Sequence, residues 1–231
     1  MSIVIPAYNE ARRLPATLAG WRAFLGDQPY PWEILVVDDG SADATADIAA
    51  TAGARVLRLE PNQGKAGAVR AGVLAASGEV IAYVDADMNV APSHLQEALR
   101  RLANDADLVA GRRDLSEYAA DEGPLRLLAG GLVQATRRLV VMSAIRDTQC
   151  GFKVFGRALG RAIFARTRIC SFAFDIEVLF VARKLGARIV ELPVSTSYRA
   201  ESTFSIRKHL PRFLQDIVQI RLNDLAGRYR A

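Results

Sequence analysis

The first 113 residues alternate apolar segments with stretches of helical periodicity, and this alternation limits the fold more than any other feature. Five apolar segments occur, at 2–6, 33–39, 54–59, 79–85 and 106–111. Their Val, Ile and Leu residues follow one another without polar alternation, which indicates strands that are buried on both faces. The sequence therefore predicts an α/β fold with a mostly parallel, Rossmann-like sheet and helices on both faces.

Polar side chains follow four of these predicted strands, at the point where each strand ends. The clusters lie at 6–10, 38–41, 85–87 and 111–113. The carboxyl ends of parallel strands share one edge, and ligands of open α/β sheets bind beyond that edge. Turn formation and helix capping would explain any one cluster alone. They explain poorly why neighbouring strand ends all carry such groups, so we expect a ligand site at this edge.

Asp85 and Asp87 form the most informative of these clusters. Residues two apart at the end of an extended segment point the same way, so both carboxylates can face one ligand. Two neighbouring carboxylates repel each other, and a cation between them would relieve the repulsion. Mg²⁺ or Mn²⁺ accepts one or two carboxylates and completes its shell with water and phosphate oxygens. The pair predicts a metal–diphosphate site, although capping or solvation alone would also explain two Asp residues after a strand.

The first two clusters suit a nucleotide. Pro6 is rigid, Tyr8 offers a ring for stacking, and Glu10 adds a carboxylate. Asp39 can accept a hydrogen bond from a base N–H or a ribose hydroxyl. Lys65 opens a predicted helix, where a lysine is usually solvated, and the letters GKAGA around it lack the spacing and the Ser/Thr of a P-loop.

Composition and charge restrict the remaining possibilities. The 231 residues are 51% hydrophobic with a net charge of +5, as expected of one globular domain. Residues 199–231 contain seven Lys/Arg against three Asp/Glu, which favours an anionic partner.

Two cysteines, without metal-ligand spacing, fit a reducing, cytosolic setting. The longest charge-free run, 127–136, is ten residues, and a bilayer span needs roughly 20. Basic residues are not interleaved with aromatic ones, so nucleic-acid binding is not expected.

Several motifs together resemble a known family. The letters IPAYNE, VVDDGSADAT, NQGKAGAVRAG and YVDADMN resemble the family-2 glycosyltransferases, which are inverting enzymes of the GT-A fold that use nucleotide-sugar donors. The later letters RDTQCGFKVF, FAFDIEVLFVARKLG, ELPV and IRLNDLAGRYR resemble the dolichyl-phosphate (polyprenyl-phosphate) β-glucosyltransferase group within that family. The resemblance covers nearly the whole chain, and DTQCGFK is far more specific than the pair of aspartates.

The resemblance implies roles for individual residues. Its donor site would comprise Pro6, Tyr8, Glu10, Val37, Asp39, Lys65, Asp85, Ala86 and Asp87. Asp39 would contact the nucleobase, while Asp85 and Asp87 would hold Mg²⁺ or Mn²⁺ with the diphosphate. Its acceptor phosphate would meet Arg112 and Arg199. Related enzymes often read Glu-Ser-Lys after the late loop. This chain has Thr203 in place of that lysine, and Arg207 or Lys208 would substitute for it.

The implied reaction moves a hexose, preferentially glucose, from a UDP-sugar to polyprenyl or dolichyl phosphate. A monoalkyl phosphate is an anion near neutral pH, so this nucleophile scarcely needs a general base. The expected catalytic residues are Asp85, Asp87, Arg112 and Asp147. Asp147 or Asp175 would orient a sugar hydroxyl or an arginine, or would only cap a turn or a helix. Two alternatives stay open: a GDP-mannose-dependent or otherwise different transferase, and a nucleotide-sugar-binding regulator without turnover.

The same reading divides the single domain, 1–231, into three parts. Residues 1–113 would bind the nucleotide sugar, 114–204 would form the acceptor side, and 205–231 would form a terminal amphipathic helix. Segment 124–146 and the terminal helix both combine apolar clusters with basic residues. Such helices lie in the membrane interface and are drawn to anionic lipid. We therefore expect a cytoplasmic protein that associates with the cytoplasmic face of a membrane. Alternatively, the apolar faces of these two segments would pack on the domain itself or against a second subunit of a homodimer.

Overall fold

The computed structural model describes residues 1–113, 145–171, 173–195 and 206–230, with the backbone alone described for 206–210. Within these residues, seven strands form one sheet in the order β3-β2-β1-β4-β6-β5-β7. The strands are β1 (Ser2–Ala7), β2 (Glu33–Asp38), β3 (Arg55–Arg58), β4 (Val80–Val84), β5 (Leu108–Arg113), β6 (Phe152–Gly156) and β7 (Ile189–Val194). The helices are α1 (Leu14–Gly26), α2 (Thr45–Thr51), α3 (Gly64–Ala75), α4 (His94–Asn104), α7 (Arg157–Phe164), α8 (Phe174–Lys184) and α9 (Ile206–Leu225).

The five strands expected in the first half are all present, and the α/β fold class is confirmed. Two further strands, β6 and β7, come from the second half of the chain. β6 runs antiparallel between β4 and β5, while the other neighbouring strands pair in parallel. Because β6 runs the opposite way, the chain enters it at the edge where the other six strands end. The segment before β6, which contains the DTQCG letters, therefore reaches the predicted ligand edge.

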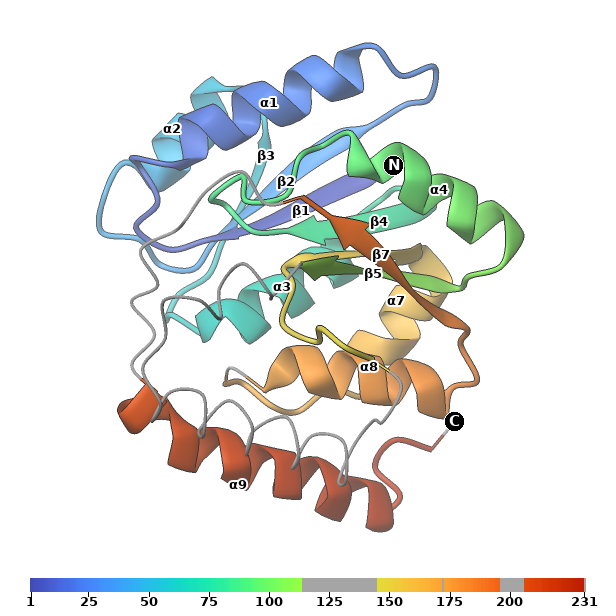
Figure 1. Ribbon diagram of the computed structural model, residues 1–231. Helices are drawn as coiled ribbons and strands as arrows, with labels where there is room; N and C mark the ends of the chain where they lie inside the picture. Colours follow the sequence, from blue (N-terminus) through green and yellow to red (C-terminus); the bar gives the residue numbers. More distant parts are fainter. Residues whose placement is uncertain (114–144, 172, 196–205, 231) are drawn as a thin grey trace, which may run out of the picture.

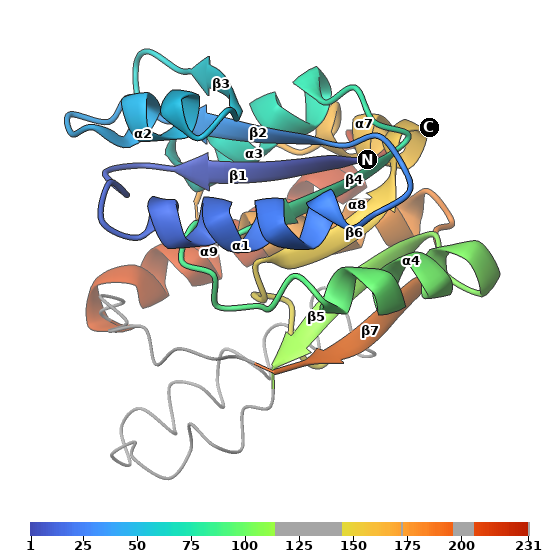
Figure 2. The same ribbon diagram turned by 90° about the horizontal axis from the view of Figure 1, so that it is seen from above.

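Helices cover both faces of the sheet (Figure 1). α1, α2 and α4 pack on one face, and α3, α7 and α8 pack on the other. α9 lies beyond α8 as a further layer, visible at the bottom of Figure 1; in Figure 2, seen from above, it lies behind α1 and the sheet. α8 is buried along almost its entire length, because it lies between the sheet and α9. This explains why its apolar residues are not confined to one face.

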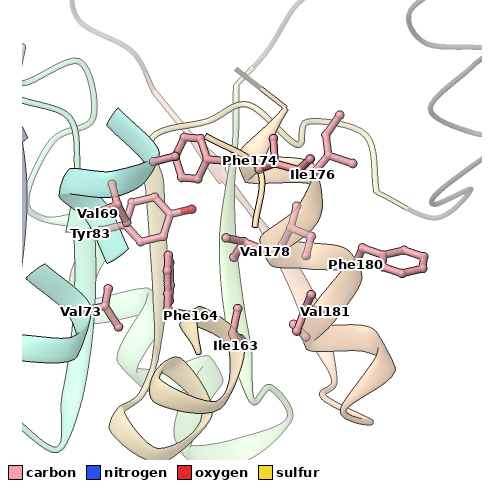
Figure 3. Packing of buried hydrophobic residues seen from close by; sticks show 14 of the residues in the cluster. Val69, Val73, Tyr83, Ile163, Phe164, Phe174, Ile176, Val178, Phe180 and Val181 are labelled. Atoms are coloured by element: carbon pink, nitrogen blue, oxygen red, sulfur yellow. The ribbon is translucent and has the colours of Figure 1, made fainter. Parts of the chain in front are cut away.

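Side chains of the central strands alternate between two hydrophobic clusters. On β1, Val4 belongs to the α3 side, whereas Ile3 and Ile5 belong to the α1 side. Both faces therefore need apolar residues, which produces the continuous apolar runs in the sequence. Figure 3 shows the α3 side, where Tyr83 lies among aliphatic and aromatic residues of α3, α7 and α8.

The terminal helix is confirmed as an amphipathic element. Phe213, Ile217 and Ile220 are buried, while Val218 and Leu222 are half exposed. Most of segment 124–146 lies outside the described residues. In the described part of the chain, no helix is long and apolar enough to cross a membrane.

Candidate active site

A pocket of about 210 Å³ opens at the carboxyl edge of the sheet, between the ends of β1, β2 and β4. Its lining residues are Pro6, Ala7, Tyr8, Glu10, Arg13, Asp39, Lys65, Ala68, Asp85, Ala86 and Asp87. Eight of the nine residues expected at the donor are in this lining. The ninth, Val37, has a fully buried side chain in the α3-side cluster, because alternation along β2 turns it into the core.

The loop after β1 is held in an uncommon conformation. Asn9 has φ of 54°, in the left-handed region that most residues avoid. Its backbone N–H donates to the Ser41 hydroxyl at 2.9 Å, and its side-chain oxygen accepts the Ala42 N–H at 2.9 Å. The next residue, Glu10, donates its N–H to Thr45 Oγ1 at 2.8 Å. These bonds tie the β1 loop to the β2 loop, so that Tyr8 is left 52% exposed at the pocket.

The loop after β4 is also fixed through its backbone. The Asp85 N–H donates to the Gly151 carbonyl at 3.2 Å, and Thr17 Oγ1 donates to the Ala86 carbonyl at 2.6 Å. Met88 has φ of 53°, a conformation that costs about 1–3 kcal/mol for such a residue. Its side chain packs against Gly20 of α1, where any side chain would clash with it. The strained turn positions the preceding acidic pair at the pocket.

Lys65 forms an ion pair with one of the two aspartates. Its Nζ lies 2.5 Å from Asp85 Oδ1, and the two side chains keep 41% and 33% of their surface exposed. Desolvation opposes both charges, but the pairing prevails: the pKa of Lys65 is raised by Asp85 and Asp175, and the pKa of Asp85 is lowered by Lys65. Because Lys65 lies in the first turn of α3, the sequence indicated that it would reach the carboxyl edge of the sheet. The sequence did not indicate that Asp85 would be its partner.

Asp87 has the opposite electrostatics. Desolvation and the neighbouring charge of Asp85 raise its pKa, against one hydrogen bond from the Asn89 N–H at 3.1 Å. Burial likewise raises the pKa of Asp39, although its Oδ1 accepts the Gln63 N–H at 2.7 Å. The pocket thus contains acidic groups whose charge the protein leaves incompletely compensated. Such groups favour a cationic or hydrogen-bond-donating ligand.

The residues present fit a divalent cation bound together with a diphosphate. Asp85 and Asp87 supply hard carboxylate oxygens to one pocket. Burial and the charge of Asp85 raise the pKa of Asp87, and a cation between the two carboxylates would relieve their repulsion. Among the described residues, no cluster of three His, Cys, Asp or Glu side chains surrounds a common point. A cation here would therefore need phosphate oxygens and water in its shell, as Mg²⁺ and Mn²⁺ accept.

Two of the residues expected to meet or orient the acceptor, Arg112 and Asp147, lie in the described part of the chain. Arg112 and Arg113 end β5, and both are half-buried. Asp147 lies across from them, but its partner is Arg113: Nε donates to Oδ2 at 2.8 Å and Nη2 to Oδ1 at 3.1 Å. This pairing lowers the pKa of Asp147 against the effect of burial. No described residue forms a hydrogen bond or ion pair with the Arg112 side chain.

Asp175 accepts hydrogen bonds from two buried residues, and the sequence analysis did not connect either of them with it. Its Oδ1 accepts hydrogen bonds from Lys153 Nζ at 2.5 Å and from Tyr83 OH at 2.7 Å. All three residues are essentially buried, so Asp175 does not face the pocket. A lysine within the apolar strand FKVF was the available signal, because a buried lysine needs a partner. Arg199 lies outside the described residues, as do the side chains of Arg207 and Lys208.

This sheet, with an acidic pair and a lysine at its carboxyl edge, has the architecture of a GT-A glycosyltransferase. The chain belongs to Glycosyl transferase family 2, whose family model matches residues 2–167. The fold class and glycosyltransferase membership expected from the motifs are confirmed.

Several curated proteins that are similar to this chain share the name of one group within the family. The chain is 34% identical to a dolichyl-phosphate β-glucosyltransferase of Dictyostelium discoideum, over 98% of this chain and 75% of that protein. It is 36% identical to the Drosophila melanogaster enzyme of the same name, over 84% of this chain and 66% of that protein. The human enzyme of that name is 30% identical, with coverage of 100% and 77%. The resemblance to this group is therefore confirmed.

Solved structures support the fold. Glucosyl-3-phosphoglycerate synthase from Mycobacterium tuberculosis, in complex with Mn²⁺, UDP-glucose and phosphoglyceric acid, superposes with a TM-score of 0.70. The alignment covers 99% of this chain and 79% of the synthase, at 19% identity. At this identity the likeness concerns the fold alone.

Proposed function

We propose that this protein transfers glucose from UDP-glucose to a polyprenyl phosphate such as dolichyl phosphate, with inversion at the anomeric carbon. The observation that carries the proposal is the pocket that gathers Tyr8, Asp39, Lys65, Asp85 and Asp87 in a family-2 chain. The names of the curated relatives supply the sugar and the lipid acceptor. The site supplies the rest of the argument.

The donor is held by groups with distinct tasks. The exposed ring of Tyr8 offers a stacking surface for the uracil, and Asp39 offers an acceptor for its N–H. Asp85 and Asp87 would hold Mg²⁺ or Mn²⁺, which stabilises negative charge on the departing diphosphate. Lys65 lies within reach of the same region, so its ammonium can turn from Asp85 to a phosphate oxygen when the donor binds.

The acceptor needs orientation more than activation. The phosphate oxygen of the lipid attacks the anomeric carbon, and the bond from that carbon to the β-phosphate oxygen of UDP breaks. Because the attacking phosphate is already an anion, no residue has to remove a proton from it. Arg112 can hold this phosphate, since no described residue pairs with its guanidinium. Positioning and charge stabilisation then supply most of the rate enhancement.

A lipid acceptor also requires docking at a membrane. α9 exposes Val218, Leu222 and Leu225, with Arg221 and Arg228 on the same helix and the turn that follows it. An apolar stripe with basic neighbours suits an anionic lipid surface. We propose peripheral association through this stripe at the cytoplasmic face. A homodimer through the same stripe is the alternative, and sedimentation with and without anionic vesicles distinguishes the two.

The proposal is tested by offering radiolabelled donors singly with polyprenyl phosphate, Mg²⁺ or Mn²⁺, and separating the lipid products by thin-layer chromatography. We expect label in the lipid fraction from UDP-glucose, and its loss when EDTA is added. Lipid labelling from GDP-mannose alone would establish the mannosyl alternative. Donor binding without any lipid product from any of the donors offered would instead indicate a regulator without turnover.

A further inference from the structure

A buried ion pair lies next to the candidate active site. Lys153 of β6 and Asp175 of α8 keep only 1% and 3% of their side chains exposed, and Nζ lies 2.5 Å from Oδ1. Lys153 is paired in register with Tyr83 on β4, two residues before Asp85. Tyr83 lies beside Val69, between Phe174 and Phe164, in Figure 3, and its hydroxyl donates to the same Asp175 oxygen.

The three protons of the Lys153 ammonium all have acceptors. Besides Asp175, they meet the carbonyl oxygens of Thr148 at 3.2 Å and Cys150 at 2.9 Å. The lysine therefore holds the backbone of segment 147–151 from inside the protein. Stability is a weak explanation for such a pair, because a buried ion pair replaced by neutral residues of similar size often leaves a protein equally stable.

Segment 147–151 contacts both sides of the candidate active site. At its end, the Gly151 carbonyl accepts the Asp85 N–H, and a Cβ on Gly151 would lie 1.9 Å from Asp85 Oδ2. The carboxylate of Asp85 thus rests directly on this glycine. At its start, Asp147 binds the guanidinium and the backbone N–H of Arg113, which adjoins Arg112 on β5. A shift of this short segment would move both contacts together.

We propose that Lys153 and Asp175 are a positioning pair, which fixes segment 147–151 so that Asp85 and the arginines at the end of β5 keep the spacing that transfer requires. This inference rests on the proposed function, because it assigns Asp85 to the donor and Arg112 to the acceptor. The pair itself touches neither substrate. Lys153 binds the backbone carbonyls of Thr148 and Cys150, and the segment that contains them contacts Asp85 through Gly151.

The pair is held by charge as well as by shape, because each of the two buried groups is the other's counter-ion. Removing both charges while keeping the shape would leave the core filled but the segment unanchored. The two functions of the pair, stability and positioning, can therefore be separated experimentally.

The decisive variant is Lys153→Met/Asp175→Asn, in which the Asn can still accept the Tyr83 hydroxyl. It is compared with wild type by thermal unfolding, by Mn²⁺ affinity in the presence of UDP from electron paramagnetic resonance, and by kcat and KM for both substrates. We expect a cooperative transition near that of wild type, with Mn²⁺ affinity and kcat each reduced about 10- to 100-fold, as for other outer-shell partners. UDP binding without metal should stay unchanged.

Two single variants form a matched control. Tyr83→Phe and Tyr229→Phe each remove a buried hydroxyl from a buried carboxylate, Asp175 in the first case and Glu177 in the second. We expect both to unfold at a lower temperature while keeping Mn²⁺ affinity near that of wild type, because each leaves the Lys153–Asp175 pair in place. A double variant that folds and binds Mn²⁺ like wild type would overturn the positioning role. Wild type without Mn²⁺ binding or turnover would instead reject the proposed function itself.

Discussion

Partly buried acidic groups have opposite electrostatics at the two ends of the sheet. At the amino end, Glu33 accepts four hydrogen bonds, from the Ser2 hydroxyl at 2.6 Å, from the Ser77 N–H and hydroxyl at 2.7 and 2.6 Å, and from Arg55 Nη1 at 3.4 Å. Burial alone would raise its pKa, but these donors lower it to about 2. At the carboxyl end, Asp87 accepts a backbone N–H, and its pKa is raised by burial and by Asp85.

The difference separates a structural carboxylate from one that is prepared for a ligand. Glu33 is stabilised in its charged form, so it contributes to folding at neutral pH. Asp87 is destabilised in its charged form, so folding at neutral pH retains a cost that a bound cation would relieve. The same edge also stores backbone strain at Asn9 and Met88, as active sites often do. Stability and ligand binding are thus concentrated at opposite ends of the same strands.

The largest effect is expected for Asp87→Asn. Loss of this carboxylate should reduce metal-dependent transfer by about 100-fold or more, because charge on the leaving diphosphate is then poorly stabilised. The melting temperature should stay unchanged or rise, since a carboxylate with a raised pKa is removed. Parallel assays of transfer and thermal unfolding check both. Full transfer by this variant in the presence of EDTA would show that Asp87 does not serve to bind a metal, and the contrast with the structural carboxylate of Glu33 would no longer hold.

An intermediate effect is expected for Lys65→Met. Without nucleotide, the lysine occupies Asp85 Oδ1, so its removal should raise Mn²⁺ affinity severalfold. With the donor present, the loss of a phosphate contact should weaken UDP-glucose binding about tenfold, which corresponds to one charge-assisted hydrogen bond. Mn²⁺ titration and calorimetry with UDP-glucose measure the two quantities. An unchanged Mn²⁺ affinity would mean that lysine and metal do not compete for Asp85.

The smallest effect is expected for Glu33→Gln. At pH 7 it should lower the free energy of unfolding by about 1 kcal/mol, allowing for screening of a partly exposed group. Because the pKa of Glu33 is depressed when folded, its contribution is complete above the usual value of 4.5 and is lost as the pH falls toward about 2. Urea unfolding across this range should show wild type and variant converging. Transfer at pH 7 should be unaffected, and a loss of activity would link this edge to the site.

Much of this molecule could be predicted from its sequence. The apolar runs identified the strands of the first half, because a buried parallel strand needs apolar residues on both faces. The polar residues after those strands identified the lining of the pocket, since parallel strands bring their carboxyl ends to one edge. The motif letters led to the family. Each of these signals is local, and periodicity or position along the chain is enough to reveal it.

The pairings within the site were decided only by the tertiary structure. β6 is inserted antiparallel between β4 and β5, and this insertion brings Gly151 onto Asp85 and Asp147 onto Arg113. Lys65 with Asp85, and Lys153 with Asp175, join residues of different elements that lie about 20 positions apart, without helical or strand periodicity to connect them. Sequence spacing reveals which charged residues reach an edge of the sheet, but their partners depend on how distant segments pack. For that reason the sequence indicated where the site lies, and the folded arrangement decided which charges in it are compensated.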